Sequence, residues 1–239
     1  SNFMFIGWFT YTQADSEHPN EQQWYTAQGN YDGDTAVLDL YETLGGKFDD
    51  PQEVSTQKVG QVTLSFSDCE NGWMTYRFDN EGAQGGFPLA RVIPGSENLC
   101  ESKTQPSIES QDINLGMDGA WYNVDTSGQG YYFDVHTNDQ GENFIFVSWF
   151  TYGDDTVSGQ RWLTAQGPFD GPLAEIEVYE TTGGSFDDPK EVETVKVGTM
   201  TIDFEDCNNA ALIYSIDNGV EGGFDITRVV PGGESLCED

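Results

Sequence analysis

Short apolar runs separated by turn residues dominate the chain. Within residues 115–239 eight such runs occur, and none has the 3.6-residue period of an amphipathic helix. Between residues 197 and 204, Met200, Ile202 and Phe204 alternate with polar residues, which is typical of a strand with one buried face. The pattern predicts eight β-strands, at 120–123, 131–136, 144–152, 161–166, 174–181, 197–204, 211–216 and 224–229.

Eight sequential strands with short links favour an up-and-down antiparallel barrel, because closure removes both edges of the sheet. A β-sandwich is the alternative, since it gives the same strand spacing. In the barrel order every second strand finishes at the same end. Cys207 follows one of these strands and Cys237 follows another, so we expect the two sulfur atoms to meet in a disulfide at that end.

The same sequence elements occur twice along the chain. NFMFIGWFTY (2–11) matches NFIFVSWFTY (143–152), QQWYTAQG (22–29) matches QRWLTAQG (160–167), and GGKFDDPQEV (45–54) matches GGSFDDPKEV (183–192). Self-similarity over this length indicates one domain type used twice. The predicted organisation is an incomplete barrel repeat at 1–100, a linker at 101–114 and a complete barrel repeat at 115–239.

The first repeat has no counterpart of residues 119–142, so it begins on what would be its third strand. The prediction is therefore an all-β chain of two tandem antiparallel up-and-down barrels, the first lacking its two N-terminal strands. A barrel without these strands would keep two open edges, which natural proteins avoid. We expect an N-terminal segment that was removed or left out, and strands supplied by another chain are the alternative.

Cys69 and Cys100 repeat the arrangement of Cys207 and Cys237, and no C-x-x-C pair occurs. Each predicted bridge closes a loop of about 30 residues, which contributes on the order of 3 to 4 kcal/mol in the chain-entropy model. Disulfides persist in oxidising compartments, so a secreted or cell-surface protein is indicated. The absence of an N-x-[ST] sequon favours a bacterial source.

A tryptophan and an arginine mark the two ends of the predicted barrel. Trp121 lies in GAWYN on the first strand, and Arg228 lies in ITRVV on the last, which becomes its neighbour on closure. The guanidinium can stack on the indole while its donors bond nearby carbonyls. This pair resembles the signature of the calycin superfamily, the lipocalins and avidins, in which a G-x-W on the first strand packs under a basic residue on the last.

The calycin resemblance implies a barrel that carries a small hydrophobic ligand inside an open mouth. The alternative is an interior filled by side chains, as in most small eight-stranded barrels. Candidates for that filling are Tyr131, Phe144, Phe146, Phe150 and Trp162.

The two FDDP segments carry paired aspartates that suggest calcium, which prefers clustered carboxylate oxygens. These calcium candidates are Asp49, Asp50, Asp187 and Asp188, and no other cofactor is expected. The favoured alternative is a helical turn that begins at Asp188, with Pro189 at its first position and Glu191 as a capping-box acid. Residues 50–53 repeat that arrangement.

The strand at 144–152 is apolar on both faces, although a barrel strand needs only one apolar face. We expect Phe144, Phe146, Phe150 and Tyr152 to point inward and the other face to be an assembly surface. It would be covered by the other barrel, the linker or another subunit, or alternatively by the barrel's own long loop. The candidate assembly residues are Met4, Ile6, Trp8, Ile145, Val147 and Trp149.

The balance of charge narrows the function. Forty-two acidic residues against nine basic ones give a formal net charge of -33, which argues against nucleic acid and anionic membranes as partners. No apolar stretch is long enough for membrane insertion. His18 and His136 do not occupy equivalent positions in the two repeats, and no catalytic set is recognisable, so we expect no enzyme.

We therefore expect a non-enzymatic extracellular assembly or binding module of a larger cell-surface or filamentous structure. It would associate with itself or with another extracellular protein that supplies or covers strands. A calycin-like carrier of a small hydrophobic ligand is the alternative.

Overall fold

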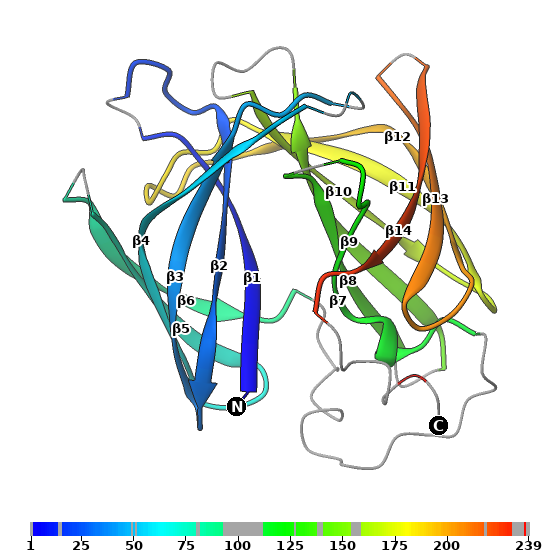
Figure 1. Cartoon of the computed structure of the whole chain (residues 1–239), viewed down its shortest axis with the longest axis horizontal. Helices are drawn as coiled ribbons and strands as arrows, with labels where there is room; N and C mark the ends of the chain where they lie inside the picture. Colours follow the sequence, from blue (N-terminus) through cyan, green and yellow to red (C-terminus); the bar gives the residue numbers. More distant parts are fainter. Residues whose placement is uncertain are drawn as a thin grey trace.

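The computed structural model describes residues 2–13, 16–48, 50, 52–79, 82–92, 112–126, 128–137, 141–153, 159–217, 219–230 and 237. These residues form two antiparallel sheets that lie beside each other, a curled sheet from the first part of the chain and a closed barrel from the second (Figure 1). The predicted all-β fold is confirmed, with a barrel rather than a sandwich in the second repeat. The described residues include no helix with the length and apolar composition that a bilayer crossing requires.

The curled sheet has six strands in sequential order: β1 (Asn2–Tyr11), β2 (Gln22–Asp32), β3 (Thr35–Leu44), β4 (Ser55–Phe66), β5 (Asn71–Phe78) and β6 (Gln84–Ala90). Its concave face carries an apolar cluster that includes Leu38, Leu40, Val62 and Leu64. The outer strands are β1 and β6, and within the described residues each pairs with a strand on one side only. The sheet thus curls toward a barrel without closing.

The barrel has eight strands: β7 (Gly119–Tyr122), β8 (Gly130–Thr137), β9 (Asn143–Tyr152), β10 (Gln160–Pro168), β11 (Leu173–Thr182), β12 (Glu193–Phe204), β13 (Asn209–Ile216) and β14 (Val220–Arg228). A short 3-10 helix, η1 (Leu115–Met117), precedes β7. The barrel closes where β14 pairs with β7, with Arg228 opposite Trp121. All eight strands overlap their predicted ranges.

Side chains from all eight strands fill the barrel. They form one buried apolar cluster whose largest members include Trp121, Trp149 and Tyr214. In β12, Met200, Ile202 and Phe204 are buried in this cluster, so the predicted alternation is confirmed. The interior is packed in the manner of small eight-stranded barrels.

The prediction for the two faces of β9 is wrong. Ile145, Val147 and Trp149 are at most 1% exposed and point into the barrel core, whereas Phe150 belongs to a separate cluster outside it. Trp162, which we also expected inside, lies outside as well and contacts Phe9 of the curled sheet. Both faces of β9 are apolar because both are buried, so the sequence pattern does not show which face is inside.

The outer face of the barrel is covered by the curled sheet. Phe150 of β9 lies 5.4 Å from Trp24 of β2 and 6.3 Å from Phe9 of β1, measured between ring centroids. The Trp24 indole donates to Thr151 O at 3.0 Å, and the Trp162 indole donates to Thr10 O at 3.1 Å. The cover expected for a two-faced strand is therefore the other repeat, although it lies over the opposite face of β9.

Two buried glutamines join the sheets by equivalent hydrogen bonds. Gln160 donates to Trp24 O at 3.0 Å and accepts from Trp24 N at 3.2 Å. Gln22 donates to Trp162 O at 2.9 Å and accepts from Trp162 N at 3.2 Å. Each amide bonds the backbone of the other sheet in the way a strand neighbour would. The two repeats thus contact each other through the same residues of both, as in an isologous interface.

Candidate functional site

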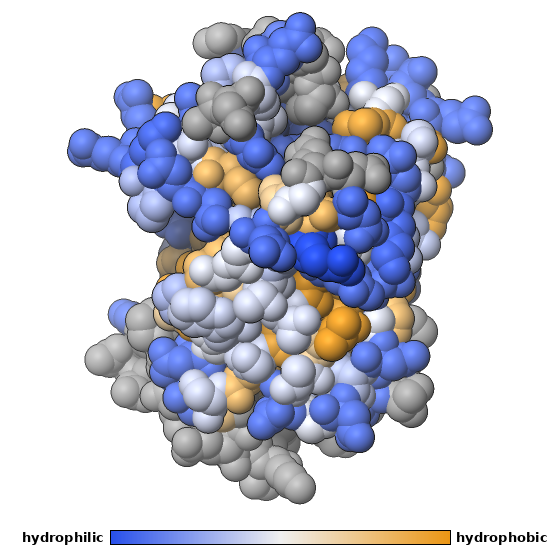
Figure 2. Space-filling model, turned by 90° about the vertical axis from the view of Figure 1, so that its left-hand side faces the viewer, coloured by the Kyte–Doolittle hydropathy of each residue, from blue (hydrophilic) through white to orange (hydrophobic). Residues whose placement is uncertain are grey.

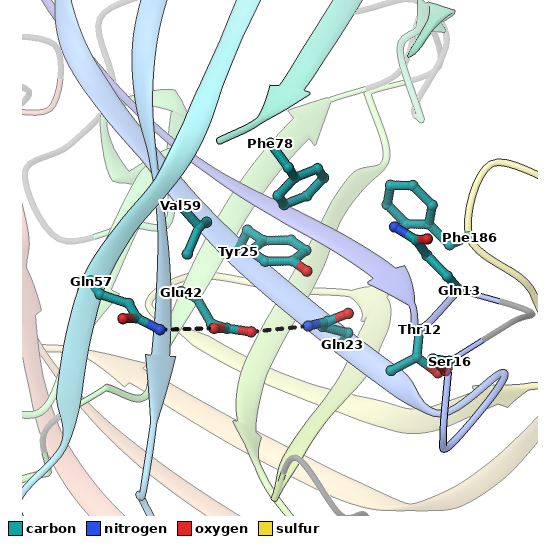
Figure 3. Close-up of a pocket in the computed structure, with 10 residues that line it drawn as sticks. All are labelled: Thr12, Gln13, Ser16, Gln23, Tyr25, Glu42, Gln57, Val59, Phe78 and Phe186. Atoms are coloured by element: carbon teal, nitrogen blue, oxygen red, sulfur yellow. Dashed lines mark hydrogen bonds between the residues drawn. The ribbon is translucent and has the colours of Figure 1, made fainter. Parts of the chain in front are cut away.

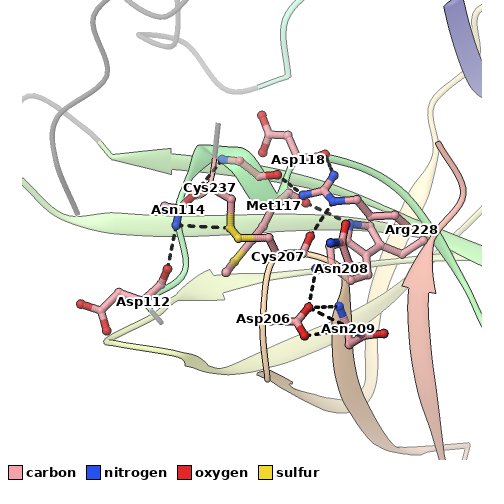
Figure 4. Close-up of a disulfide and its surroundings, with 12 residues drawn as sticks. Asp112, Asn114, Met117, Asp118, Asp206, Cys207, Asn208, Asn209, Arg228 and Cys237 are labelled. Atoms are coloured by element: carbon pink, nitrogen blue, oxygen red, sulfur yellow. Dashed lines mark hydrogen bonds between the residues drawn. A yellow bond between two sulfur atoms is a disulfide. The ribbon is translucent and has the colours of Figure 1, made fainter. Parts of the chain in front are cut away.

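The predicted disulfide joins two segments at one end of the barrel, close to Arg228 (Figure 4), and the predicted Trp–Arg pair lies at the same end. Cys207 and Cys237 are bonded, with their Cα atoms 5.8 Å apart. The Arg228 guanidinium lies 4.8 Å from the centroid of the Trp121 ring. Its Nε donates to Cys207 O at 2.6 Å and its Nη1 to Asp118 O at 2.8 Å, while its Nη2 donates to Gly116 O. The arginine therefore holds β14, β7 and η1 together.

Asp118 lies at the same end and was not singled out from the sequence. Its Oδ1 accepts a hydrogen bond from Val135 N at 2.6 Å. Burial raises the pKa of this carboxyl to about 8, against the lowering effect of the Val135 bond. Burial also raises the pKa of nearby Asp134. Asp118 accepts its hydrogen bond from the backbone of β8 and does not line the cavity described below, so we attribute its raised pKa to a structural role.

The corresponding end of the curled sheet has the arginine but not the strands that it would hold. Arg91 Nε donates to Cys69 O at 2.8 Å, as Arg228 does to Cys207. Among the described residues, none accepts a hydrogen bond from its Nη atoms, and no strand pairs with the free edge of β6. Cys69 is disulfide-bonded, and its predicted partner Cys100 lies outside the described residues.

The concave face of the curled sheet is apolar up to its open edge. Met4, Ile6 and Trp8 of β1 are half-buried and pack against the cluster inside the sheet. Viewed from the curled-sheet side, the surface of the molecule also shows patches of hydrophobic side chains near its middle, between hydrophilic ones (Figure 2). These three predicted assembly residues thus line the open sheet. Ile145, Val147 and Trp149 are excluded from an assembly surface because the barrel core buries them.

The FDDP segments are loops that contact the opposite repeat. Phe186 packs on Trp8 and Tyr76 of the curled sheet, with ring centroids 5.6 and 5.4 Å away. Phe48 packs on Trp149 and Tyr214 of the barrel, with both centroid distances 5.7 Å. The prediction of a helical turn from Asp188 is wrong. The chain instead makes a non-helical turn at residues 186–188, in which Asp187 has a φ of 49°. Each loop covers the mouth of the other unit instead.

The predicted calcium ligands have other partners. Asp187 accepts a hydrogen bond from the Tyr76 hydroxyl at 2.5 Å, and burial together with this carboxylate raises the pKa of Tyr76. Lys47 pairs with Asp50 at 3.2 Å, and Lys190 pairs with Asp188 at 3.5 Å. Asp49 lies outside the described residues, among which no group of three or more potential metal ligands occurs. Calcium binding at these aspartates stays a prediction.

A cavity of about 610 Å³ opens at the mouth of the curled sheet (Figure 3). Three polar side chains form a row at its edge: Gln57 donates to Glu42 at 3.4 Å, and Gln23 donates to the other oxygen of Glu42 at 3.2 Å. Aromatic rings of Tyr25, Phe78 and Phe186 form the other part of the lining, which also includes Val59, Thr12, Gln13 and Ser16. The cavity joins residues from both repeats.

The sequence did not point to this cavity or to the two bridging glutamines. The usable signal was the shared QxWxTAQG pattern in both repeats, in which the first variable position is Gln23 in one copy and Arg161 in the other. Neither histidine is among the described lining residues: His18 faces Glu21 at 4.0 Å in a loop, and His136 is buried in β8.

Three comparisons with known proteins found no match to this chain. No protein-family model matches the chain. Comparisons with the curated proteins and with the solved structures also give no significant match.

Proposed function

We propose that this chain is a non-catalytic extracellular assembly module whose curled sheet accepts a pair of β-strands from a partner protein. The observation that carries this proposal is the strand order. In the barrel, β7 and β8 lie between β14 and β9, whereas nothing lies between the corresponding strands β6 and β1 among the described residues. An open pair of edges with an apolar concave face is a template for strand addition.

The chemistry of the expected partner follows from the strands that close the barrel. In β7, Trp121 stacks under Arg228, and in β8, Tyr131, Phe133 and Val135 point into the core. A partner that closes the curled sheet would therefore carry a tryptophan for Arg91 and alternating apolar residues on its second strand. A second copy of residues 1–239 could not donate β7 and β8 without opening its own barrel.

The extracellular setting is supported by the disulfide of the barrel and by the acidic composition. We extend the calycin likeness to the whole chain on the closed eight-stranded barrel and the Trp121–Arg228 pair. In this proposal the chain is a tandem pair of such units from a secreted or surface-bound bacterial protein. Carriage of a small hydrophobic ligand has less support, because side chains from every strand fill the barrel.

Strand acceptance can be tested with a peptide of residues 117–137, which contains β7 and β8, added to the 239-residue chain. We expect saturable binding and new protection from hydrogen exchange in β1 and β6, because their free edges would gain backbone hydrogen bonds. Arg91→Ala in the protein, or Trp121→Ala in the peptide, should weaken binding at least tenfold. A scrambled peptide is the control.

Binding without protection of β1 and β6, or no binding at micromolar to millimolar peptide, would contradict strand acceptance. So would equal affinity for the peptide with and without its tryptophan, because the Arg91 position would then have no part in recognition.

A further inference from the structure

The mouths of the two units are formed by matching residues, but the side chain in the middle of each mouth differs. In the barrel, Arg161 at the start of β10 lies there, and its side chain is only 14% exposed. Its Nε donates to Glu180 at 2.8 Å, and its Nη2 donates to Asp217 Oδ1 at 3.1 Å, with Nη1 on the other oxygen of Asp217. The guanidinium thus joins two carboxylates across the mouth in a bidentate arrangement.

The curled sheet keeps both carboxylates but lacks the arginine. Glu42 corresponds to Glu180 in the matching segments YETLGG and YETTGG, and Asp79 corresponds to Asp217. The backbone N–H of Asp79 bonds to Val59 O at 2.8 Å, just as that of Asp217 bonds to Val197 O at 3.2 Å. Gln23 stands where the barrel has Arg161, and there the cavity of about 610 Å³ opens.

The cavity presents a negative charge among aromatic rings. Two amides hold the Glu42 carboxylate, as described above, and no lysine or arginine is among the described lining residues. Tyr25, Phe78 and Phe186 offer ring faces, which attract cations through their quadrupole (Figure 3). In size the cavity falls within the usual range for small-molecule sites.

We propose that this cavity binds an organic cation, a guanidinium or alkylammonium group, which pairs with Glu42 in the place that Arg161 occupies in the barrel. The barrel mouth is the internal precedent, because the same acid in the same frame already pairs with a guanidinium there. The aromatic lining favours a cation with an apolar stem, such as an arginine side chain, over a bare metal ion. The acidic surface of the chain would attract such ligands to the mouth.

The proposal can be tested with N-acetyl-L-arginine amide and its neutral isostere N-acetyl-L-citrulline amide, titrated calorimetrically into the 239-residue chain. We expect one site per chain and at least tenfold tighter binding of the arginine compound. Glu42→Gln should weaken that binding at least tenfold, because the amide cannot form the charged pair. Glu175→Gln, which removes an exposed acid of the barrel, is the matched control and should change affinity less than twofold.

Gln23→Arg provides a second test that does not depend on loss of an acid. The new side chain should pair with Glu42 as Arg161 pairs with Glu180, so it should abolish binding of the probe and raise the melting temperature. Equal binding of the citrulline compound would overturn the proposal. So would weak binding that Glu42→Gln and Glu175→Gln reduce alike, since this would indicate only diffuse attraction to the acidic surface.

Discussion

The contact between the curled sheet and the barrel depends on a few buried amides, and Gln160 tests this most directly. Its side chain is 0% exposed and makes three hydrogen bonds to the other sheet. Two link it to the carbonyl and the N–H of Trp24, and the third links it to Thr43 O at 3.1 Å. Gln160→Ala removes all three and leaves these backbone groups buried without that partner.

The expected cost follows from the number of bonds. A net contribution of about 1 kcal/mol for each hydrogen bond, together with the penalty for backbone groups left unpaired, gives a loss of about 3 to 5 kcal/mol in the free energy of unfolding. Urea denaturation followed by circular dichroism measures this loss. Hydrogen exchange should also show that the amide of Trp24 loses its protection, because Gln160 is its acceptor.

Gln22→Ala should have a similar effect, because Gln22 makes the equivalent bonds to Trp162 and to Thr181 O. Gln52→Ala is the control, since Gln52 is exposed in a loop and its loss should change stability by less than about 0.5 kcal/mol. A loss below about 1 kcal/mol for Gln160→Ala, with protection of Trp24 retained, would refute the view that these amides join the two sheets.

Two further changes test the closed end and the mouth of the barrel. Asp118 keeps a proton up to about pH 8 in the folded state but releases it near pH 4 when unfolded, so its contribution to stability is complete below pH 4 and is lost as the pH rises toward 8. Asp118→Asn keeps an acceptor for Val135 N and carries no charge, so the variant should be more stable than the parent by up to about 4 kcal/mol at pH 7 and should show no such gain at pH 4. Urea denaturation at the two pH values measures this difference. An equal difference in stability at both pH values would contradict the prediction. Phe48→Ala should lower the free energy of unfolding by about 2 kcal/mol through lost contact with Trp149 and Tyr214, and an unchanged melting temperature would show that the loop does not cover the barrel.

Local sequence patterns predicted the strands because their causes are local. Alternation of apolar and polar residues in β12 reflects one buried and one solvated face, and it was correct at Met200, Ile202 and Phe204. Up-and-down order then placed Cys207 and Cys237 at one end, where the structure joins them. Strand order alone was enough for this, because in a barrel alternate strands must finish at the same end.

The same patterns failed where a strand is buried on both faces. In β9, Ile145 and Phe150 are both apolar, and only the packing of the curled sheet decides that Ile145 is inside and Phe150 is outside. A shift of one residue exchanges the two faces of a strand, so the pattern carries no information when both faces are hydrophobic. The FDDP loops failed for a related reason: Phe186 packs on the other repeat, which local capping rules do not consider.

By itself, the sequence determined that the chain is all-β, that its elements recur, and that residues 1–239 contain only one copy of the segment that forms β7 and β8. Only the tertiary structure showed how the two copies contact each other. Gln22 and Gln160 form hydrogen bonds between the curled sheet and the barrel, and each FDDP loop covers the mouth of the other unit. It also showed that a cavity opens beside Glu42 in the curled sheet, where Gln23 stands at the position that corresponds to Arg161 of the barrel. Repetition and alternation are properties of neighbouring residues, whereas the contacts between the two sheets join residues more than a hundred positions apart, and only the folded chain brings them together.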